Sequence, residues 1–504
     1  MKIFPAPKIR ELDAFTIQNE PVASIDLMER AALTFAKWMQ EKYPDENCPL
    51  YFFCGSGNNG GDGLAVARIL QQRFYNCSVF LVSTGGEMSA DCQTNLQCLE
   101  KMRSVPIQKI ETENDFPVPP ENAILIDAIF GSGLNRPLEG LPARLIERLN
   151  SLPNERVAID IPSGLFADRH TTGLAFKAQR TLTFELPKLA FFLAENQDET
   201  GDWEVCCIGL DKKFIESQTT DFQTIEPDFL KSFLKKRKKF DHKGTYGHAL
   251  MIAGSYGKVG AAVLAAKACL RSGCGLVTVH APRSAYEILQ ISFPEAMVSV
   301  DSHQFVFCEV PNLNKYQAVG AGCGLGNSHM TEEALAELLE QCKLPLVLDA
   351  DALNLLSKNQ HLLQKLSPDT ILTPHPKEFE RLFGKTENDF ERLELLRQKA
   401  AELNCFIALK GAYTCVATPE GKCFFNTTGN PGMGTGGTGD VLTGMLTGLL
   451  AQGYTALQAC LLGVYLHGLA GDIAAQNTEQ EALLASDLIA CIGKAFAQLH
   501  ESKA

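Results

Sequence analysis

Short apolar segments separated by helical patterns constrain the fold of this chain more than any other feature of its sequence. The first four are PLYFFCG, CSVFLV, AILIDAIF and VAIDIPSG, all between residues 49 and 164. Strands that are buried on both faces of a parallel sheet have this composition, because neither face meets water. Helical patterns lie between them, near residues 62–73, 89–103 and 140–150. The alternation predicts a doubly wound α/β domain.

The same alternation starts again after a polar stretch at residues 211–243. The later strand-like segments are HALMIAG, LVTVHAP, QAVGAG, LVLDAD and FIALKG. A chain of 504 residues has room for two to four domains at about 150 residues each. We therefore expect two α/β domains, residues 1–224 and 225–504.

A basic run, KKRKK at residues 235–239, lies close to this boundary. It suits a nucleic-acid or localisation patch, or else a solvated linker face, and we favour the linker. The whole chain is acidic, with 46 Lys and Arg against 59 Asp and Glu, for a formal charge of −13. That balance argues against nucleic acid or an anionic membrane as a partner.

The 17 cysteines are scattered and form no CxxC pair, so neither a zinc site nor a secreted disulfide framework is indicated. We expect small buried thiols in a reducing cytoplasm. The start of the chain, MKIFPAPKIREL, lacks the apolar core of a signal peptide. Polar residues interrupt the most apolar region, Val441 to Ala475, which predicts a pair of buried helices and no membrane span.

A glycine-rich loop, GSGNNGGDG, follows the first apolar segment and opens a helical pattern. Glycines let a backbone approach a phosphate at a helix N-terminus, and Gly55, Gly57 and Gly60 match the spacing GxGxxG. The unusual part is the side chains of Asn58, Asn59 and Asp62. Their oxygens suit a hard monovalent cation or a ribose.

Polar groups also follow two later strands, in DAIFGSGLNRPLEG and IDIPSG. Loops that follow parallel strands meet at one edge of a sheet, where ligands bind. Asn59, Asp127 and Ser163 are thus expected to converge there as oxygen ligands. Alternatively, Asp127 and Asp160 cap turns and have no further role.

The motifs NNGGDG, DAIFGSGLNRP and DIPSG together resemble the epimerase family that acts on hydrated NADH and NADPH. This resemblance covers most of residues 1–215 and implies a Rossmann-like parallel-sheet domain. It also implies a K⁺ ion held by Asn59, Asp127 and Ser163. The substrate-binding residues that it implies are Asn58, Asn59, Gly60, Gly61, Asp62, Gly131, Ser132, Gly133, Leu134, Asn135, Arg136, Pro137 and Asp160.

A hydrated dinucleotide carries a hydroxyl at C6, beside the ring nitrogen. The nitrogen lone pair can expel this hydroxyl, and water can return on either face of the ring. A positioned carboxylate would assist the proton transfers. We expect Asp127 in that catalytic role and keep Lys188, in ELPKLAF, as a second candidate.

The stretch NPGMGTGGTGD, Asn430 to Asp440, runs directly into an apolar helical pattern. Small-molecule kinases of the ribokinase-like class place a GxGD loop before a helix. The loop N–H groups stabilise the phosphoryl group, and the aspartate accepts the proton of the attacking hydroxyl. No GxxxxGK[ST] sequence occurs, which disfavours a P-loop fold. We expect a ribokinase-like α/β domain with Asp440 as its catalytic base.

With KGTYGHALMIAGS, GAGCGLG, DADALN, TPHPKEFERL and KGAYT, this stretch resembles the nucleotide-dependent dehydratase of the same dinucleotides, over about residues 235–500. The resemblance implies Mg²⁺ and, for a bacterial fused chain, ADP as the phosphoryl donor. One departure is Lys377, where the family has glycine. The implied substrate contacts are Ala261, Gly322, His375 and Asp440. The implied nucleotide contacts are Lys410, Gly411, Ala412, Tyr413, Thr414 and Gly439.

Two such resemblances on one chain indicate the fused family that repairs hydrated NAD(P)H. Its members would interconvert R- and S-NADHX or NADPHX and then form NAD(P)H, AMP and phosphate. Two alternatives stay open: a vitamin-type kinase fused to a dinucleotide-binding domain, and a first domain that binds without catalysis. We also expect a homo-oligomer, with the apolar helices near residues 455–475 serving as interface or as core.

Overall fold

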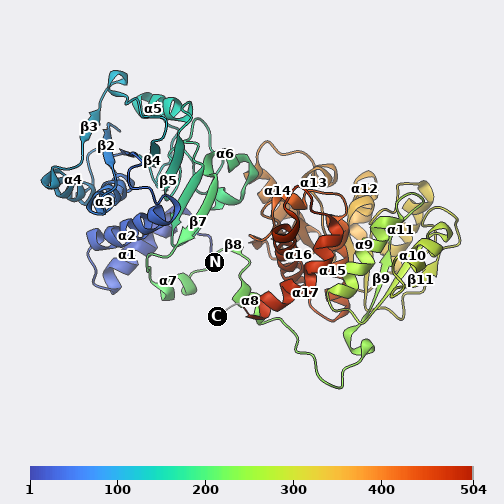
Figure 1. Cartoon of the computed structure of the whole chain (residues 1–504). Coiled ribbons are helices and arrows are strands. Elements are labelled where there is room, and N and C mark those ends of the chain that lie inside the picture. Colours follow the sequence, from blue (N-terminus) through green and yellow to red (C-terminus); the bar gives the residue numbers. More distant parts are fainter. Residues whose placement is uncertain (502–504) are drawn as a thin grey trace. The chain divides into compact units, whose positions relative to one another are not determined.

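The computed structural model describes residues 1–501, which form two compact α/β units (Figure 1). The first unit contains residues 1–220 and 388–390, and the rest of the chain from Asp221 onward forms the second. The division precedes the expected boundary at residue 224. It does so because strand β8 (Phe222–Thr224) pairs with a strand of the second unit.

The first unit is built on a parallel sheet of seven strands in the order β3-β2-β1-β4-β5-β6-β7. The strands are β1 (Leu50–Cys54), β2 (Cys77–Val82), β3 (Ile107–Ile110), β4 (Ile124–Ala128), β5 (Glu155–Ile159), β6 (Arg180–Phe184) and β7 (Asp202–Cys206). The four predicted apolar segments became β1, β2, β4 and β5. The edge strands β3 and β7 lacked an apolar signal because most of their side chains are not fully buried.

Helices cover this sheet and complete the core of the first unit (Figure 1). They are α1 (Ala6–Asn19), α2 (Ser24–Lys42), α3 (Asn58–Gln72), α4 (Ala90–Met102), α5 (Gly140–Asn150), α6 (Gln197–Thr200) and α7 (Lys212–Ser217). The three predicted helices correspond to α3, α4 and α5. Helix α3 follows β1 directly, so the glycine-rich loop lies at the carboxyl edge of the sheet.

The second unit contains a ten-stranded sheet in the order β11-β10-β9-β12-β13-β14-β15-β16-β17-β8. Its further strands are β9 (His248–Ile252), β10 (Leu276–Ala281), β11 (Met297–Val300), β12 (Ala318–Ala321), β13 (Leu346–Leu348), β14 (Ile371–Leu372), β15 (Phe406–Leu409), β16 (Cys415–Ala417) and β17 (Cys423–Phe425). Strands β15, β16 and β17 pair antiparallel, and the other pairs are parallel. The predicted α/β class is confirmed for both units.

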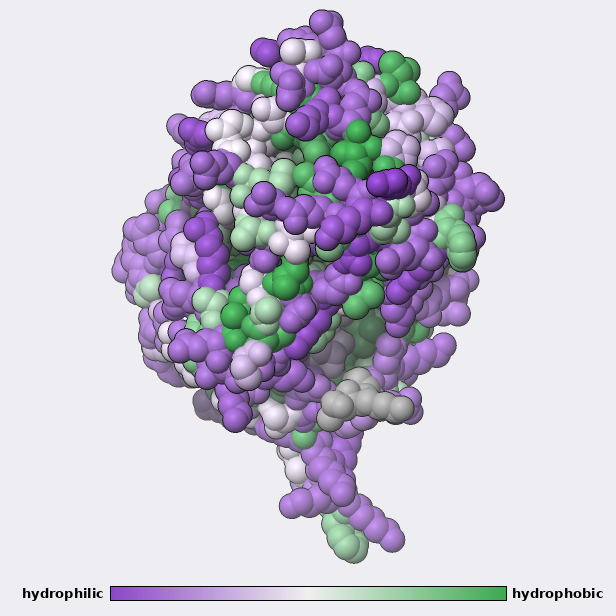
Figure 2. Space-filling view, turned by 90° about the vertical axis from the view of Figure 1, so that its left-hand side faces the viewer, coloured by the Kyte–Doolittle hydropathy of each residue, from purple (hydrophilic) through white to green (hydrophobic). Residues whose placement is uncertain are grey.

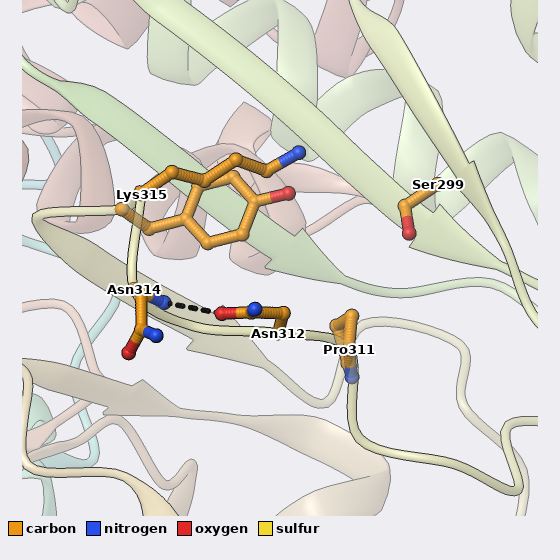
Figure 3. A pocket seen from close by; sticks show the side chains of 6 residues that line it. Ser299, Pro311, Asn312, Asn314 and Lys315 are labelled. Atoms are coloured by element: carbon orange, nitrogen blue, oxygen red, sulfur yellow. Dashed lines mark hydrogen bonds between the residues drawn. The ribbon is translucent and has the colours of Figure 1, made fainter.

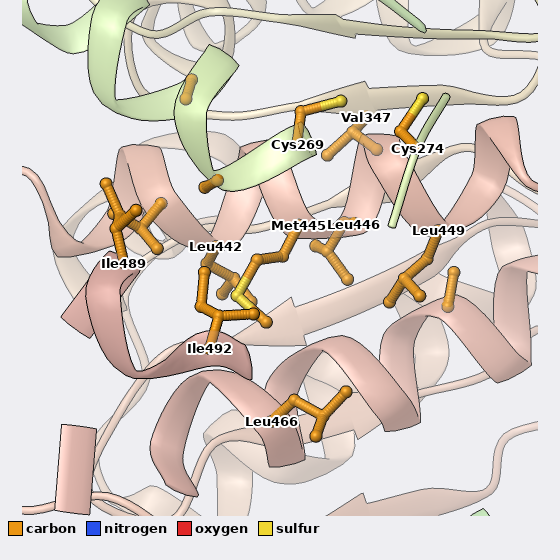
Figure 4. Close-up of a cluster of buried hydrophobic side chains, with 14 of the residues drawn as sticks. Cys269, Cys274, Val347, Leu442, Met445, Leu446, Leu449, Leu466, Ile489 and Ile492 are labelled. Carbon is orange, nitrogen blue, oxygen red and sulfur yellow. The ribbon is translucent and has the colours of Figure 1, made fainter. Parts of the chain in front are cut away.

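The helices of the second unit include a tightly packed group of four. The helices are α8 (Pro227–Lys231), α9 (Val259–Arg271), α10 (Tyr286–Ser292), α11 (His329–Gln341), α12 (Ala350–Lys358), α13 (Pro376–Phe383), α14 (Asp389–Glu402), α15 (Thr438–Ala451), α16 (Ala456–Thr478) and α17 (Ala485–Glu501). Leu442, Met445 and Leu449 of α15 pack with Leu466 of α16 and Ile492 of α17 in one core (Figure 4). Helix α9 closes the same core from its alanine-rich side.

Glycines let α9 and α15 approach closely. A Cβ atom at Gly444 would lie 2.0 Å from the carbonyl oxygen of Ala265, and one at Gly448 would lie 2.6 Å from that of Cys269. These backbone contacts leave no room for a side chain. They fix the position of the first turn of α15, which contains Asp440.

Helix α16 is long and apolar enough to cross a membrane, but 72% of its most apolar window is buried inside its own unit. The predicted pair of buried helices is therefore confirmed as α15 and α16, and these apolar helices belong to the core. Hydrophilic side chains dominate the face of the molecule in Figure 2, interrupted by small apolar groups.

The basic run at residues 235–239 covers the ends of two helices. Lys235 Nζ donates to the carbonyl of Gln452, just after α15, and Arg237 donates to that of Gly273, just after α9. Cations stabilise helix C-termini, where carbonyl groups lack partners. This arrangement favours the linker interpretation of the run.

Candidate active sites

The first site lies at the carboxyl edge of the first sheet, around Asp127 of β4. This carboxylate is fully buried and accepts hydrogen bonds from Ser163 N (2.6 Å), Ser163 Oγ (2.7 Å) and Ile129 N (3.1 Å). Burial raises the pKa of Asp127 to about 6, although the bonds from Ser163 and Ile129 oppose the shift. All three donors are neutral, so the buried charge is only partly compensated.

Asn59 joins this group through the backbone of Phe130. Its Nδ2 donates to Phe130 O at 3.1 Å, and Phe130 N donates to Ser163 Oγ at 2.8 Å. The structure thus brings Asn59, Asp127 and Ser163 together, as expected. Carboxylate, hydroxyl and amide oxygens are hard donors, and one buried negative charge matches a monovalent cation. The residues present therefore fit K⁺.

This set differs from sites for transition metals. Within residues 1–501, no group of three or more His, Cys, Asp and Glu side chains could hold a metal ion. The oxygen set at Asp127 contains one carboxylate, one hydroxyl and one amide.

A buried ion pair lies beside this group, formed by Asp160 after β5 and Lys188. The Lys188 side chain is 1% exposed, bonds to Asp160 and donates to Thr183 Oγ1 at 2.6 Å. Asp160 also accepts from Phe184 N at 3.1 Å and has a left-handed backbone, with φ 64°. These contacts hold the Asp160 carboxylate in one orientation at the sheet edge.

Two further carboxylates respond to the charge of Asp160. Burial and, to a smaller extent, the negative charge of Asp160 raise the pKa of Asp13 to about 6, whereas the positive charge of Lys188 opposes this shift. The same two causes raise the pKa of Asp62 well above its usual range. The first site therefore contains carboxyl groups that can hold a proton near neutral pH. Asp13 lies on α1, in a sequence without a motif, and was not predicted.

The remaining predicted residues of the first site lie in the first turn of α3 and in the loop after β4. They are Asn58, Gly60, Gly61 and Asp62 in α3, and Gly131, Ser132, Gly133, Leu134, Asn135, Arg136 and Pro137 in the loop. A Cβ atom at Gly60 would lie 1.9 Å from Gly55 O, so only glycine lets α3 start here. One at Gly131 would lie 3.3 Å from Asn59 Cβ, which places the loop against α3. Arg136 is exposed.

The second site lies at the first turn of α15. Asp349, which follows β13 and is 1% exposed, accepts from Lys410 Nζ and from Thr443 Oγ1, each at 2.7 Å. A Cβ atom at Gly439 would lie 3.5 Å from Lys410 Nζ and 3.7 Å from Asp349 Oδ2. Gly439 therefore lies over the ion pair, next to Asp440.

Nearby carboxylates raise the pKa values of Lys410 and Asp440 in this site. Burial opposes the shift, but Asp349 and then Glu378 raise the pKa of Lys410, so its ammonium stays charged. Burial and the neighbouring Asp349 charge raise the pKa of Asp440 above its ordinary value. A cation and a more basic carboxylate thus lie side by side. This pairing suits an anionic group and a hydroxyl that must lose its proton.

His375 caps the N-terminus of α13. Its Nδ1 accepts from Lys377 N (3.2 Å) and Glu378 N (3.3 Å), and Glu378 Oε2 accepts from His375 N (2.9 Å) in return. Burial, followed by Lys410, lowers the pKa of His375, which keeps the capping imidazole neutral. Lys377 is an exposed residue of the first helical turn, where lysine is accommodated without strain. The first turn of α13 is therefore a regular helical turn at Lys377, the position where the resembled family has glycine.

The loop after β12 and the first turn of α9 form another side of the second site. Gly322 has φ 132°, and a Cβ atom there would lie 1.8 Å from Asp349 O, so this turn requires glycine. A Cβ atom at Gly324 would lie 3.2 Å from the Cβ of Ala261, in the first turn of α9. Burial, followed by the charge of Asp440, raises the pKa of the Cys323 thiol. Gly322, which follows β12, and Ala261, in the helix after β9, therefore lie near Asp440.

The predicted nucleotide loop follows β15. Lys410 N donates to Pro374 O at 2.9 Å, and Gly411 N donates to Thr414 Oγ1 at 3.3 Å. The loop also contains Ala412 and Tyr413. Helix α16 anchors the glycine-rich stretch before Asp440, because Asp472 accepts from Gly429 N and Asn430 Nδ2, both at 2.9 Å.

A pocket elsewhere in the second unit is separate from this site (Figure 3). It is lined by Ser299, Pro311, Asn312, Asn314, Lys315 and Tyr316. Lys315 and Tyr316 precede β12, whereas Gly322 follows it, so the pocket contains none of the predicted site residues.

Both units match described protein families. Residues 249–494 match the family described as NAD(P)H-hydrate dehydratase, and residues 24–190 match the family described as YjeF-related protein N-terminus. The bifunctional NAD(P)H-hydrate repair enzyme Nnr of Moorella thermoacetica is 37% identical over 97% of this chain and 95% of its own length. The chain belongs to the bifunctional NAD(P)H-hydrate repair enzyme family.

A second repair enzyme matches over a similar length, and a solved structure matches over about half of the chain. The repair enzyme of Coxiella burnetii is 34% identical over 95% of this chain and 96% of its own. A solved ADP/ATP-dependent NAD(P)H-hydrate dehydratase from Bacillus subtilis, co-crystallised with ATP/Mg2+, is 31% identical over 55% of this chain and 98% of its own, with a TM-score of 0.49. Membership in the repair family favours repair over the vitamin-type kinase and binding-module alternatives.

The sequence did not indicate a role for three polar side chains of the second site, Asp349, Glu378 and Thr443. They lie within or next to the motifs DADALN, TPHPKEFERL and NPGMGTGGTGD. The two buried carboxylates had a usable signal, since each directly follows a strand or opens a helix in DADALN and HPKE. Their convergence on Lys410 depends on the order of β13, β14 and β15 in the sheet, which the sequence does not display.

Proposed function

We propose that the first unit interconverts the R and S forms of hydrated NADH and NADPH, and that the second unit dehydrates the S form with ADP. Membership in the repair family supports both activities. The single observation that carries the second is the arrangement at α15: Asp440 is next to Gly439, which lies over the Lys410–Asp349 pair. A base, an anion site and a helix N-terminus thus meet at one point.

The dehydration would proceed through a phosphorylated intermediate. Asp440 takes the proton of the C6 hydroxyl while the hydroxyl oxygen attacks the terminal phosphoryl group of ADP, and AMP leaves. Hydroxide is a poor leaving group, but phosphate departs when the ring nitrogen lone pair assists cleavage of the C6–O bond. Loss of a proton from C5 then restores the dihydronicotinamide, so the products are NAD(P)H, AMP and phosphate.

Lys410 and the first turn of α15 would hold the phosphoryl group during this transfer. Lys410 remains charged between two carboxylates, and the N–H groups around Gly439 point along the start of the helix. Mg²⁺ typically binds one or two carboxylates together with nucleotide phosphates, and Asp349 and Glu378 are the buried carboxylates at hand. When bound, it would neutralise phosphate charge.

The first site would separate cation binding from proton transfer. We assign Asn59, Asp127 and Ser163 to K⁺, which would neutralise the buried Asp127 charge. Asp127 is fully buried and already accepts three hydrogen bonds, whereas Asp160 lies at the sheet edge with Lys188. We therefore prefer Asp160, whose carboxylate is held in place by Lys188, for moving the proton as the C6 hydroxyl leaves and water returns. Asp127 remains the alternative.

We also propose a cytoplasmic homo-oligomer that needs neither nucleic acid nor a membrane. The acidic composition supports the absence of nucleic acid, with 59 Asp and Glu against 46 Lys and Arg. Light scattering of the purified chain gives the molar mass in solution, and a mass of one chain would contradict the proposal.

The variant Asp440→Asn tests the second activity. It keeps the shape of the side chain but removes the base. We expect ADP-dependent recovery of absorbance at 340 nm from S-NADHX to fall by about 10²–10⁴-fold, the usual contribution of a general base. Interconversion of the epimers, followed by chromatography, should continue. Retained dehydration in this variant would contradict the role of Asp440.

The same assay with ADP or ATP identifies the phosphoryl donor. We expect faster recovery with ADP, and a higher rate with ATP would reverse that assignment. A stable phosphorylated product without NADH would instead indicate a vitamin-type kinase.

A further inference from the structure

Two exposed aromatic rings lie together beside the second site. Tyr256, in the loop after β9, is 71% exposed, and Phe305, in the loop after β11, is 46% exposed. Their ring centroids are 5.1 Å apart, with an interplanar angle of 77°. Large aromatic side chains normally bury most of their surface, so a paired and exposed set needs an explanation.

The loop of Phe305 is held rigidly by a buried carboxylate. Asp301, which is 1% exposed, accepts from His303 N (2.8 Å) and Cys308 N (2.9 Å), and it contacts His280 Nε2 at 3.2 Å. Burial alone would raise the pKa of Asp301, but these hydrogen bonds lower it below its ordinary value. The loop is therefore built around a permanent negative charge.

The two loops are also joined to each other. Tyr256 N donates to Phe305 O at 2.9 Å, so the main chain below the rings is paired. A rigid platform loses little conformational entropy when it binds a ligand, because its side chains are already placed. The pair thus has the properties of a preorganised binding surface.

Contacts connect this platform to the substrate side of the second site. Ser255, the neighbour of Tyr256, donates from Oγ to Gly324 O at 2.8 Å. Gly324 lies against Ala261 and follows Cys323, whose thiol borders Asp440. In the sheet, β9 and β11 are on one side of β12, whereas β15 with its nucleotide loop is on the other. The rings are therefore on the side away from Lys410.

We propose that Tyr256 and Phe305 stack against the adenine ring of the hydrated dinucleotide. This inference rests on the proposed dehydration at Asp440. A dinucleotide has two rings: the ring with the C6 hydroxyl must be at Asp440, so the adenosine half extends outward from it. The platform borders that side and offers exposed π faces to a flat aromatic base. Tyr256 and Phe305 are thus specificity-determining residues that bind the half of the substrate that does not react.

The variants Tyr256→Ala, Phe305→Ala and the double variant test this inference. With S-NADHX, we expect the KM of the double variant to rise about tenfold, the effect of one base-stacking contact, while kcat stays unchanged. With the hydrate of reduced nicotinamide mononucleotide, which lacks the adenylate, the KM should not change. The KM for ADP should also stay constant, and Tyr256→Phe should retain the KM of the unmodified enzyme.

A matched control is Tyr286→Ala, which removes another exposed aromatic ring, 47% exposed at the start of α10. It should leave every constant unchanged. An unchanged KM for S-NADHX in the double variant overturns the inference, as does an equal rise with the short substrate. A rise in the KM for ADP alone would assign the rings to the nucleotide and also overturn it. If the unmodified chain does not dehydrate S-NADHX, the proposed function fails, and this inference fails with it.

Discussion

Single residues in this protein act through the groups that surround them. Asp440 and Lys410 are ordinary side chains whose charge states are set by Asp349, Glu378 and burial. Another example is His467 of α16, whose ring Nε2 contacts Thr438 O at 2.8 Å, in the first turn of α15. Burial lowers the pKa of His467 from 6.5 to about 4, so the neutral ring supports this turn.

The second unit should therefore lose stability in acid. The lowered pKa means that the contribution of His467 is complete above pH 6.5 and is lost as the pH falls towards 4. The loss is at most about 3 kcal/mol. We expect His467→Gln to flatten this dependence, measured by urea unfolding with circular dichroism. Both tryptophans, Trp38 and Trp203, are in the first unit, so an unchanged tryptophan-fluorescence transition serves as the internal control. An equally steep loss in the variant would contradict the role of His467.

The cation site gives a second prediction at this scale. Asp127→Asn keeps the shape of the side chain but removes its charge, so the affinity for K⁺ should fall by more than about tenfold. Epimerisation should then slow and lose its response to added KCl, measured by chromatography of R- and S-NADHX. Dehydration of pure S-NADHX should proceed as before. A potassium response that survives in this variant would remove Asp127 from the site.

At the scale of elements, the packing of α9 against α15 determines the position of the first turn of α15, which contains Asp440.

The sequence predicted some elements better than others. Continuous apolar segments made the central strands predictable, but short or half-exposed strands such as β3, β7 and β8 lacked that signal. The roles of Gly444 and Gly448 were equally hidden. A glycine in an apolar helix has no signature until the partner helix is known, and Ala265 is far from it in sequence.

The substitution Gly444→Ala tests this packing. Its Cβ atom would meet the backbone of α9, so the helices must separate, and we expect a loss of at least about 2 kcal/mol in the free energy of unfolding. Dehydration should weaken as well, because the first turn of α15 moves. Gly493→Ala is the matched control, since no atom lies within 4 Å of its added Cβ in α17. The control should stabilise the chain by about 0.5–1 kcal/mol. Similar effects of both substitutions would contradict the close approach.

At the scale of the whole molecule, the motifs of each site belong to a single unit. Every predicted residue of the first site precedes Thr220, and every one of the second follows Asp221. Because of this separation, the two sets of motifs could be interpreted independently of each other. Asp13 of α1 lies outside any motif and comes near Asp160 only in the folded unit, so the sequence did not indicate it.

Two separate pieces of the chain should each retain one activity. We expect residues 1–220 to interconvert pure R-NADHX, and residues 221–504 to dehydrate S-NADHX with ADP, at rates within about tenfold of the full chain. The assays are chromatography for the first piece and absorbance at 340 nm for the second. A mixture of the two pieces that works where neither works alone would contradict their independence.

The position of β8 determines where such a cut can be made. This strand completes the far edge of the second sheet beside β17, although it precedes the basic run at residues 235–239 in the chain. A gene split within the basic run would leave one strand of the second enzyme encoded at the tail of the first. The products would then be complementing fragments that must find each other, whereas a split before Asp221 keeps every strand of each sheet in one product.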